Sequence, residues 1–238
     1  MVTAPLRSKQ CQLADWPAHK RLCGGPVMVA AVEGKGRGLV AVRDIAAGEL
    51  ITRDRAVLTL SWGVSYEDAG EDIRLLQRQV NSLPDVDRDR FYKLSSRKTI
   101  LQKLRDSPYK EATAIFFNNA IASDGFNVMS SNNGHERSVY LTLSLLNHSC
   151  APNSAYTDLT RDSRTKELRA VQDIRKREEV TITYLGFQAL LRDTGFRLRR
   201  LAASWGFVCS CGQCDNTRRA LHEGSVTAEI RRLMKSKE

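Results

Sequence analysis

The chain has 238 residues, 42% of them hydrophobic and 27% charged, a composition typical of one globular unit with a sizeable core. The first ten residues lack the apolar stretch of a signal peptide, and no apolar run approaches the roughly 20 residues of a membrane span. We therefore expect a protein of the nucleus and/or cytoplasm that makes no membrane contact. The net charge of +10 is spread over 37 basic and 27 acidic residues, which favours a solvated basic surface over direct nucleic-acid binding.

The predicted elements follow the order strands, helices, strands. Glycine-broken β-branched segments between residues 27 and 60 predict short strands and hairpins. Residues 66–83 have apolar side chains at helical spacing, and the segments that begin at Pro84 and Pro108 place proline in a favoured first turn. Strands return over 154–185, and one last helix is expected over 187–206. The predicted fold class is α+β, mostly β.

Cysteine spacing gives the strongest local signal. Cys209, Cys211 and Cys214 form C-S-C-G-Q-C, a knuckle whose thiolates can turn onto one metal ion. Thiols stay reduced inside cells, so this clustering indicates Zn²⁺ before disulfides. A closed tetrahedral site needs a fourth ligand, for which Cys150 is the candidate. The predicted metal ligands are Cys150, Cys209, Cys211 and Cys214.

The stretch around Cys150, L-S-L-L-N-H-S-C-A-P-N-S, leaves a second interpretation open. On an extended segment His148 would share a face with Cys150, so the pair could act as a base and its nucleophile in a hydrolase. That reaction needs a free thiol and a third group that orients the histidine. A cysteine that binds zinc is no longer available for it.

Four pieces of the sequence, taken together, resemble a known family. They are G-K-G-R-G-L at 34–39, N-H-S-C-A-P-N at 147–153, E-E-V-T-I-T-Y at 178–184 and W-G-F-V-C-S-C-G-Q-C at 205–214. In this order they resemble the SET domain of protein lysine methyltransferases, in particular the branch that carries a MYND zinc finger. The resemblance implies small curved β-sheets with a pseudoknot, a helical insert and a C-terminal zinc-binding post-SET motif.

The same resemblance implies a domain organisation. It places a remnant of a MYND finger at 1–24, a SET domain at 25–204 with its helical insert at about 64–123, a post-SET zinc knuckle at 205–216 and a helical tail at 217–238. The remnant keeps Cys11, His19 and Cys23, whereas Arg7 stands where the family has a cysteine. With three of eight ligands, the finger is not expected to hold zinc.

The implied activity is methyl transfer from S-adenosylmethionine to a lysine of a protein substrate, such as a histone tail, by a monomer. Tyr184 is the implied catalytic residue, because its hydroxyl can orient donor and acceptor for in-line displacement. No separate strong base is required, since a cationic cofactor and an apolar channel lower the pKa of the lysine. The implied cofactor contacts are Lys35, Gly36, Arg37, Gly38, Asn119, Asn147, His148, Tyr184 and Phe207.

Three positions depart from the family pattern. Arg177 stands where glycine is usual, Trp205 where tyrosine is common and Ile121 where an aromatic residue is common. Trp205 and Ile121 would line the channel for the target lysine. These substitutions, with the incomplete finger, support an alternative in which the chain is a catalytically inactive SET scaffold that acts as a protein-interaction module. The intact Tyr184 and N-H-S-C favour the enzyme.

Overall fold

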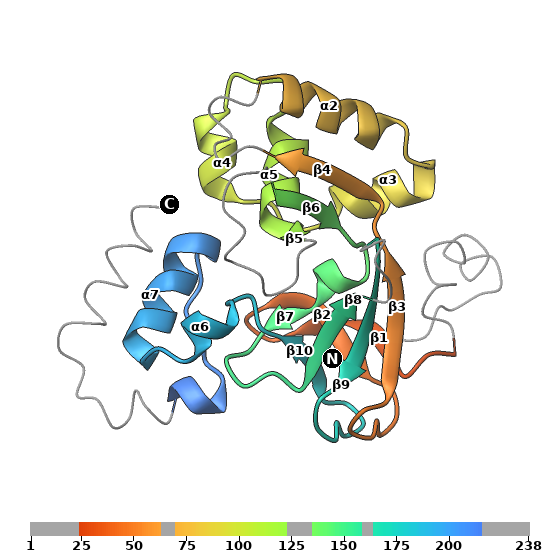
Figure 1. Ribbon diagram of the computed structural model, residues 1–238, viewed down its shortest axis with the longest axis vertical. Helices are drawn as coiled ribbons and strands as arrows, with labels where there is room; N and C mark the ends of the chain where they lie inside the picture. The colour runs from red at the N-terminus through yellow and green to blue at the C-terminus, as the bar shows by residue number, and fades with distance from the viewer. Residues whose placement is uncertain (1–23, 63–69, 123–134, 159–163, 216–238) are drawn as a thin grey trace.

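The computed structural model describes residues 24–62, 70–122, 135–158 and 164–215 (Figure 1). Three small β-sheets are combined with a group of helices that follows the fourth strand. In Figure 1 this helical group and one sheet lie above the other two sheets, and the last two helices lie beside them. Among the described residues, no helix has the length and apolar character that crossing a bilayer requires.

The first sheet brings together segments that are far apart in the sequence. Its strand order is β1-β2-β10-β7. Strands β1 and β2 form an antiparallel hairpin, whereas β10 runs parallel to β7 and pairs Thr181 with Asn147 and Ile182 with His148. The hairpin turn contains Gly34 and Gly36, both with the positive φ that glycine adopts without strain. The strands are β1 (Val27–Val32), β2 (Gly36–Ala41), β7 (Asn147–His148) and β10 (Glu179–Ile182).

The other two sheets have three strands each and are antiparallel. One has the order β3-β9-β8, with β3 (Leu50–Arg55), β8 (Ser154–Asp158) and β9 (Thr165–Ala170). The other has the order β4-β6-β5, with β4 (Leu58–Trp62), β5 (Ile121–Ala122) and β6 (His135–Val139). The helices packed on this last sheet are α2 (Gly70–Asn81), α3 (Asp85–Tyr92), α4 (Lys98–Lys103) and α5 (Lys110–Asn119).

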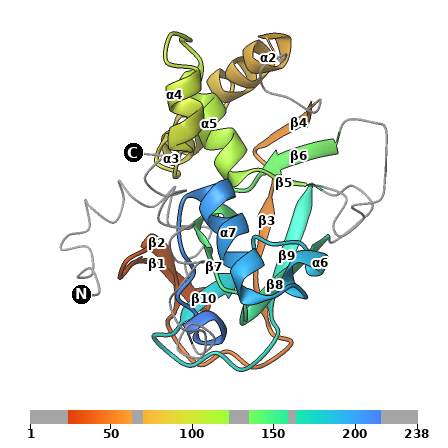
Figure 2. The ribbon, with the colours of Figure 1, turned by 90° about the vertical axis from the view of Figure 1, so that its left-hand side faces the viewer.

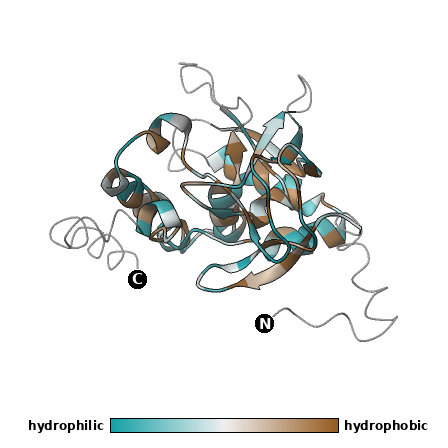
Figure 3. Ribbon diagram, turned by 90° about the horizontal axis from the view of Figure 1, so that it is seen from below, coloured by the Kyte–Doolittle hydropathy of each residue, from teal (hydrophilic) through white to brown (hydrophobic). Residues whose placement is uncertain are grey.

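Three apolar cores hold these parts together. The first lies between the helical group and β4 and β6, and includes Phe91 and Phe116. The second lies between the two other sheets and includes Leu39 and Tyr140. The third packs helix α7 (Thr194–Trp205) against the cysteines. Brown and teal residues alternate along the ribbons in Figure 3, as expected for elements with one apolar side.

The predicted fold class is confirmed: small sheets are combined with a helical insert, and three of the four clustered cysteines follow α7. The single helix predicted over 187–206 is wrong, because the structure has α6 (Phe187–Leu190) and α7 as separate helices. Asp193 has extended backbone angles and accepts the Phe196 N–H through its side chain, so it begins a new helix. The predicted finger remnant, apart from Gly24, and the tail at 217–238 lie outside the described residues.

Candidate functional site

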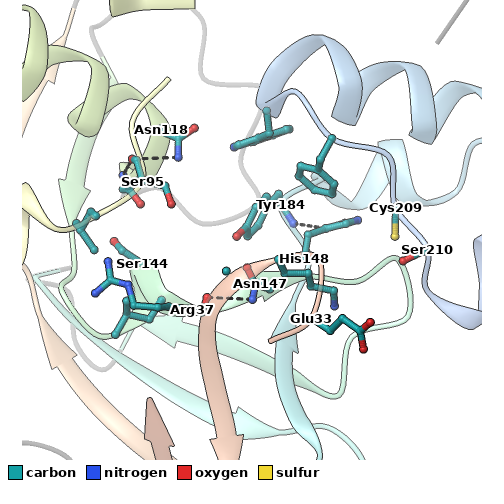
Figure 4. Close-up of a pocket in the computed structure, with 18 of the residues that line it drawn as sticks. Glu33, Arg37, Ser95, Asn118, Ser144, Asn147, His148, Tyr184, Cys209 and Ser210 are labelled. Carbon is teal, nitrogen blue, oxygen red and sulfur yellow. Dashed lines mark hydrogen bonds between the residues drawn. The ribbon is translucent and has the colours of Figure 1, made fainter. Parts of the chain in front are cut away.

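A cavity of about 740 Å³ opens where six separate segments meet (Figure 4). These are the β1–β2 turn, the chain after α3, the end of α5, the segment from Ser144 to strand β7, Tyr184 after β10, and the end of α7 with the chain that follows it. Most of the predicted cofactor residues line this cavity: Lys35, Gly36, Arg37, Asn119, Asn147, His148, Tyr184 and Phe207. Trp205, predicted for the substrate channel, lines it as well. The volume lies within the usual range for small-molecule sites.

Gly38 and Ile121 do not line the cavity. A Cβ atom at Gly38 would lie 2.8 Å from Asn147 Nδ2 and 2.8 Å from a Val32 methyl group. The absence of a side chain at Gly38 therefore leaves room for the Asn147 side chain. Ile121 lies in β5, where it pairs with Ser138 of β6, and it packs against the second core. The structure therefore gives Gly38 a position behind the cavity wall and Ile121 a position in a sheet.

Asn147 belongs to a polar network that the sequence analysis did not foresee. Its amide donates to Glu179 Oε1 at 2.8 Å. It also donates to the Arg37 carbonyl at 3.2 Å (Figure 4). Glu179 Oε2 forms an ion pair with Lys35 Nζ at 2.6 Å. Glu179 thus joins the glycine turn to strand β7. Only the fold could have identified it, because its partners lie 144 and 32 residues away.

The end of the helical insert forms the opposite wall of the cavity. Asn119 Nδ2 donates to the carbonyls of Ser95 and Ile115, each at 2.7 Å, and Asn118 Nδ2 donates to Ser95 at 3.2 Å. Ser144, in the 3-10 turn η1 (Leu143–Leu145), also lines the cavity. Within the described part of the chain, its buried hydroxyl has no hydrogen-bond partner. Ser144 is therefore a further candidate contact for a bound molecule, and no sequence signal marked it.

Four aromatic rings form one side of the cavity. Tyr184 lies 5.4 Å from His148 and 5.4 Å from Trp205 between ring centroids, and Phe207 lies 5.9 Å from His148. The faces of such rings attract cations, and their surfaces exclude water. This side of the cavity can therefore accept a positively charged group next to a flat, apolar one.

Tyr184 is fixed at both its backbone and its hydroxyl. Its N–H donates to His148 Nδ1 at 3.0 Å, and its hydroxyl donates to the Leu146 carbonyl at 2.7 Å. Burial raises the pKa of Tyr184 well above its usual value, and the nearby Glu179 carboxylate adds to this effect. The phenol therefore stays protonated at neutral pH and acts as a hydrogen-bonding group, not as a base.

The predicted zinc ligands come together as one cluster. The sulfurs of Cys150, Cys209, Cys211 and Cys214 all lie within 4.8 Å of one another. A tetrahedral zinc with 2.3 Å bonds separates its sulfurs by about 3.8 Å, so this donor set fits the ion. Hydrogen bonding among the four thiols lowers the pKa of Cys209 and Cys211 and raises the pKa of Cys150 and Cys214. Four sulfurs at this spacing are a donor set suited to a metal cation.

A buried arginine adjoins this cluster. Arg197 on α7 is 4% exposed. Burial alone would lower the pKa of its guanidinium, but the sulfurs of Cys150 and Cys214 more than offset this, so that the pKa is raised. The guanidinium therefore keeps its positive charge in spite of its burial.

The geometry of His148 decides against the hydrolase. Its Nε2 lies 3.3 Å from Cys150 Sγ, the distance expected of a nucleophile and its base. However, its Nδ1 accepts the Tyr184 N–H, so a neutral ring carries its proton on Nε2 and donates it to the sulfur. A histidine in this tautomer cannot take a proton from the thiol. The pair supports a metal-bound thiolate instead.

Four features together define the class of protein. They are the glycine turn, the paired strands β7 and β10, the buried tyrosine and the cysteine cluster. The family model for the SET domain matches residues 36–185, and the chain belongs to this family. It is 27% identical over 231 residues to N-lysine methyltransferase SMYD2 of Sus scrofa, a match that covers 94% of this chain and 48% of that protein.

Two further comparisons agree with this family. Histone-lysine N-methyltransferase SET5 of Saccharomyces cerevisiae (strain YJM789) is 36% identical over 84 residues, which cover 35% of this chain and 15% of that protein. The chain thus spans less than half of the length of both curated relatives. The solved structure of Rubisco LSMT bound to AdoMet has the same fold, with a TM-score of 0.52 and 17% identity over 87% of this chain and 57% of that one.

Proposed function

We propose that this chain is an S-adenosylmethionine-dependent protein lysine N-methyltransferase of the MYND-associated branch. One observation carries the proposal: a single cavity combines the glycine turn, the Asn147–His148 strand and a buried, protonated Tyr184 hydroxyl. SET5 and SMYD2, the relatives described above, are named as lysine methyltransferases.

The residues around the cavity fit the cofactor. The glycines on either side of Lys35 let a ligand approach the backbone closely, and the Lys35 ammonium lies at the cavity wall, where it pairs with Glu179. The Phe207 ring offers a surface for a purine, and the Ser144 hydroxyl, which has no partner among the described residues, offers a hydrogen bond. When bound, S-adenosylmethionine supplies a methyl group on a positively charged sulfur, which an amine can displace in line.

The chain's own groups position the lysine and keep it uncharged. The Tyr184 hydroxyl is already held by the Leu146 carbonyl, so it marks a fixed point for the incoming amine at no cost in reorganisation. The rings of Tyr184, Trp205 and Phe207 exclude water, which lowers the pKa of an approaching lysine ammonium. Bulk water accepts the proton before transfer, so the site needs no general base.

We also propose one Zn²⁺ per chain, held by Cys150, Cys209, Cys211 and Cys214. Its role would be structural, because four protein ligands leave no open position for substrate. The ion would attach the segment that carries Phe207 to the turn that carries Asn147 and His148.

The substrate would be a histone or another protein of the nucleus or cytoplasm. The remnant of the MYND finger, with Cys11, His19 and Cys23, would not add a second zinc.

The decisive experiment combines cofactor binding with transfer. The purified chain is titrated with S-adenosylmethionine by calorimetry and then incubated with the methyl-labelled cofactor and a dialysed nuclear and cytoplasmic extract. We expect binding and label on lysine of one or more proteins. Binding with no label on any protein would instead favour the inactive scaffold, and so would the absence of binding.

A further inference from the structure

Asp54 is a buried acid in strand β3 that does not line the cavity. Its side chain is 2% exposed, and it lies opposite the fully buried Lys166 of β9. Figure 2 shows β3 beside β9, below the helical insert. Residues paired across antiparallel strands share a face of the sheet, so the lysine brings a positive charge to the same side. Burying a carboxylate is costly unless such charges and hydrogen bonds compensate it.

The Asp54 side chain accepts two backbone hydrogen bonds from a distant segment. Its Oδ2 accepts the N–H of Thr142 at 2.6 Å and the N–H of Leu143 at 3.0 Å. These two buried residues form the start of η1, where a helical turn leaves N–H groups that it cannot satisfy itself. Thr142 provides no side-chain cap for them. Asp54 therefore caps this turn from another strand.

The turn that Asp54 caps forms part of the cavity wall. Ser144 and Leu145 line the cavity, and Figure 4 shows Ser144 beside it. The Leu145 N–H donates to the Thr142 carbonyl at 3.1 Å. The place of both lining residues thus depends on how the turn begins.

A short path of hydrogen bonds continues from this turn to the phenol of Tyr184. The Leu143 carbonyl accepts the Leu146 N–H at 3.0 Å, and the Leu146 carbonyl accepts the Tyr184 hydroxyl at 2.7 Å. A 3-10 turn of three residues has poorer hydrogen-bond geometry than an α-helix and little stability of its own. The direction of the Leu146 carbonyl therefore depends on the cap that Asp54 supplies.

The neighbouring residues of β7 have anchors of their own. Asn147 donates to Glu179 Oε1 at 2.8 Å, and both Asn147 and His148 pair with β10. None of these contacts passes through Asp54. Loss of the Asp54 carboxylate should therefore disturb the Tyr184 hydroxyl more than the part of the cavity that would hold the cofactor.

We propose that Asp54 is a positioning residue for methyl transfer: its carboxylate caps η1, which fixes the Leu146 carbonyl and, through it, the Tyr184 hydroxyl. The proposal rests on the function proposed above. It assigns to the second sheet a role in the reaction, although Asp54 itself touches neither the cavity nor a bound molecule.

The test separates cofactor binding from transfer in the full chain. Calorimetry with S-adenosylmethionine and single-turnover labelling of a dialysed extract are applied to wild type, Asp54→Ala and Asp54→Asn. We expect transfer by Asp54→Ala to fall on the order of 100-fold, as for a small misplacement of a reacting group, with much less change in cofactor affinity. Asp54→Asn keeps a neutral acceptor oxygen, which accepts a weaker bond, so it should recover most of this loss but not all.

Asp173→Asn is the matched control. Asp173 is an exposed carboxylate outside the cavity lining that also accepts a backbone N–H from a distant segment, that of Ala47 at 2.9 Å. The same substitution there should leave cofactor affinity and transfer at the wild-type level. Unchanged transfer by a folded Asp54→Ala variant would overturn the proposal.

A double variant distinguishes positioning from a purely structural role. If Asp54 acts through the Tyr184 hydroxyl, Asp54→Ala should have little further effect on transfer in a Tyr184→Phe background, because that hydroxyl is already gone. A residue that only stabilises the fold would lower transfer by the same factor in both backgrounds. Losses that multiply in the double variant would therefore overturn the proposal.

A spectroscopic readout needs neither substrate nor transfer. The chain is labelled with tyrosine that carries ¹³C at Cζ, the carbon bonded to the hydroxyl, and the Tyr184 signal is identified by its loss in Tyr184→Phe. Because the Cζ shift depends on the hydrogen bond of the phenol, the Tyr184 signal should move in Asp54→Ala and stay in place in Asp173→Asn. A signal that does not move would overturn the proposal even if transfer fell.

The two readouts also keep this inference apart from the proposed function. Wild type that transfers no methyl group would refute the proposed function, whereas the Cζ signal would still decide whether Asp54 holds the Tyr184 hydroxyl. If Asp54→Ala does not fold, Asp54→Asn replaces it in every measurement. It should then show a smaller loss of transfer and a smaller shift of the signal, and the absence of both would overturn the proposal.

Discussion

Tyr184 is held by two hydrogen bonds that serve different ends. The backbone bond to His148 fixes the strand end, whereas the hydroxyl bond to the Leu146 carbonyl fixes the phenol inside the cavity. In Tyr184→Phe the ring remains and one hydrogen bond is lost, which should lower the free energy of unfolding by about 1 kcal/mol. Binding of S-adenosylmethionine should persist, while methyl transfer should fall by two orders of magnitude or more, about 3 kcal/mol.

Calorimetry and a single-turnover transfer assay measure the two quantities separately. Tyr92→Phe is the control, because the Tyr92 hydroxyl accepts a hydrogen bond from Gln77 at 3.2 Å and lies outside the cavity lining. Equal transfer by wild type and Tyr184→Phe would remove Tyr184 from the mechanism.

The raised pKa of Tyr184 has a consequence for stability in alkali. In the unfolded chain the phenol ionises at a pKa of about 10, whereas burial keeps it protonated in the native state. Above pH 10 the unfolded state therefore loses a proton that the native state retains, and stability falls as the pH rises. Urea unfolding at pH 9, 10 and 11 should show a steeper loss for wild type than for Tyr184→Phe. Parallel curves would contradict the burial of this hydroxyl.

Arg177, which stands where the family usually has glycine, has an unusual backbone conformation. It is the only residue other than glycine with positive φ in the described chain, at 73°, in the turn before β10. A side chain there costs energy that glycine avoids, although glycine also gains freedom when unfolded. Arg177→Gly should therefore stabilise the fold by about 0.5–1 kcal/mol without altering the cavity.

Thermal unfolding of Arg177→Gly measures this gain. Arg175→Gly, in the same turn and without a positive φ, is the control and should destabilise. A lower melting temperature for Arg177→Gly than for wild type would mean that the arginine side chain makes a compensating interaction.

At the scale of elements, local patterns in the sequence predicted the parts of the site that are contiguous. The glycine turn, N-H-S-C and the C-terminal knuckle are short runs with their own chemistry, and the structure places all three around one cavity. Glu179 and Arg197 escaped prediction, because a glutamate in a strand and an arginine in a helix look like ordinary surface residues. The partners of Glu179 are supplied by the pairing of β10 with β7 and β2, and Arg197 is buried by the packing of α7.

The boundaries of the helices could likewise be predicted only in part from local sequence patterns. Apolar spacing runs through residues 187–206 as if for one helix, yet a capping aspartate divides it. The short helix α4, from Lys98 to Lys103, has too few residues for a periodic signal and was not predicted. Its position depends on contacts with α5 and on Arg97, which donates from its backbone to the Ala114 carbonyl and from its side chain to the Ser204 carbonyl. Tertiary contacts of this kind leave little trace in a local pattern.

For the whole molecule, the cysteine cluster is the link between the segment that follows α7 and the first sheet. Cys150 follows β7, whereas the other three cysteines follow α7, so one ion would join segments separated by about 60 residues. The cavity depends on this link, since Phe207, Cys209 and Cys211 form part of its wall. Metal binding and cofactor binding should therefore be coupled through the same contacts.

Cys150→Ser tests this coupling directly. Removing one of four thiolates should reduce bound zinc well below one per chain, and the affinity for S-adenosylmethionine should fall on the order of tenfold or more because the Phe207 wall is released. Metal analysis and calorimetry measure the two effects, and Gln213→Ala, an exposed change inside the knuckle that removes no sulfur, is the control. Chelation of zinc from the wild type should reproduce the loss of cofactor affinity. Zinc lost with cofactor affinity intact would show that the cavity stands without the metal, and zinc retained by Cys150→Ser would remove Cys150 from the ligand set.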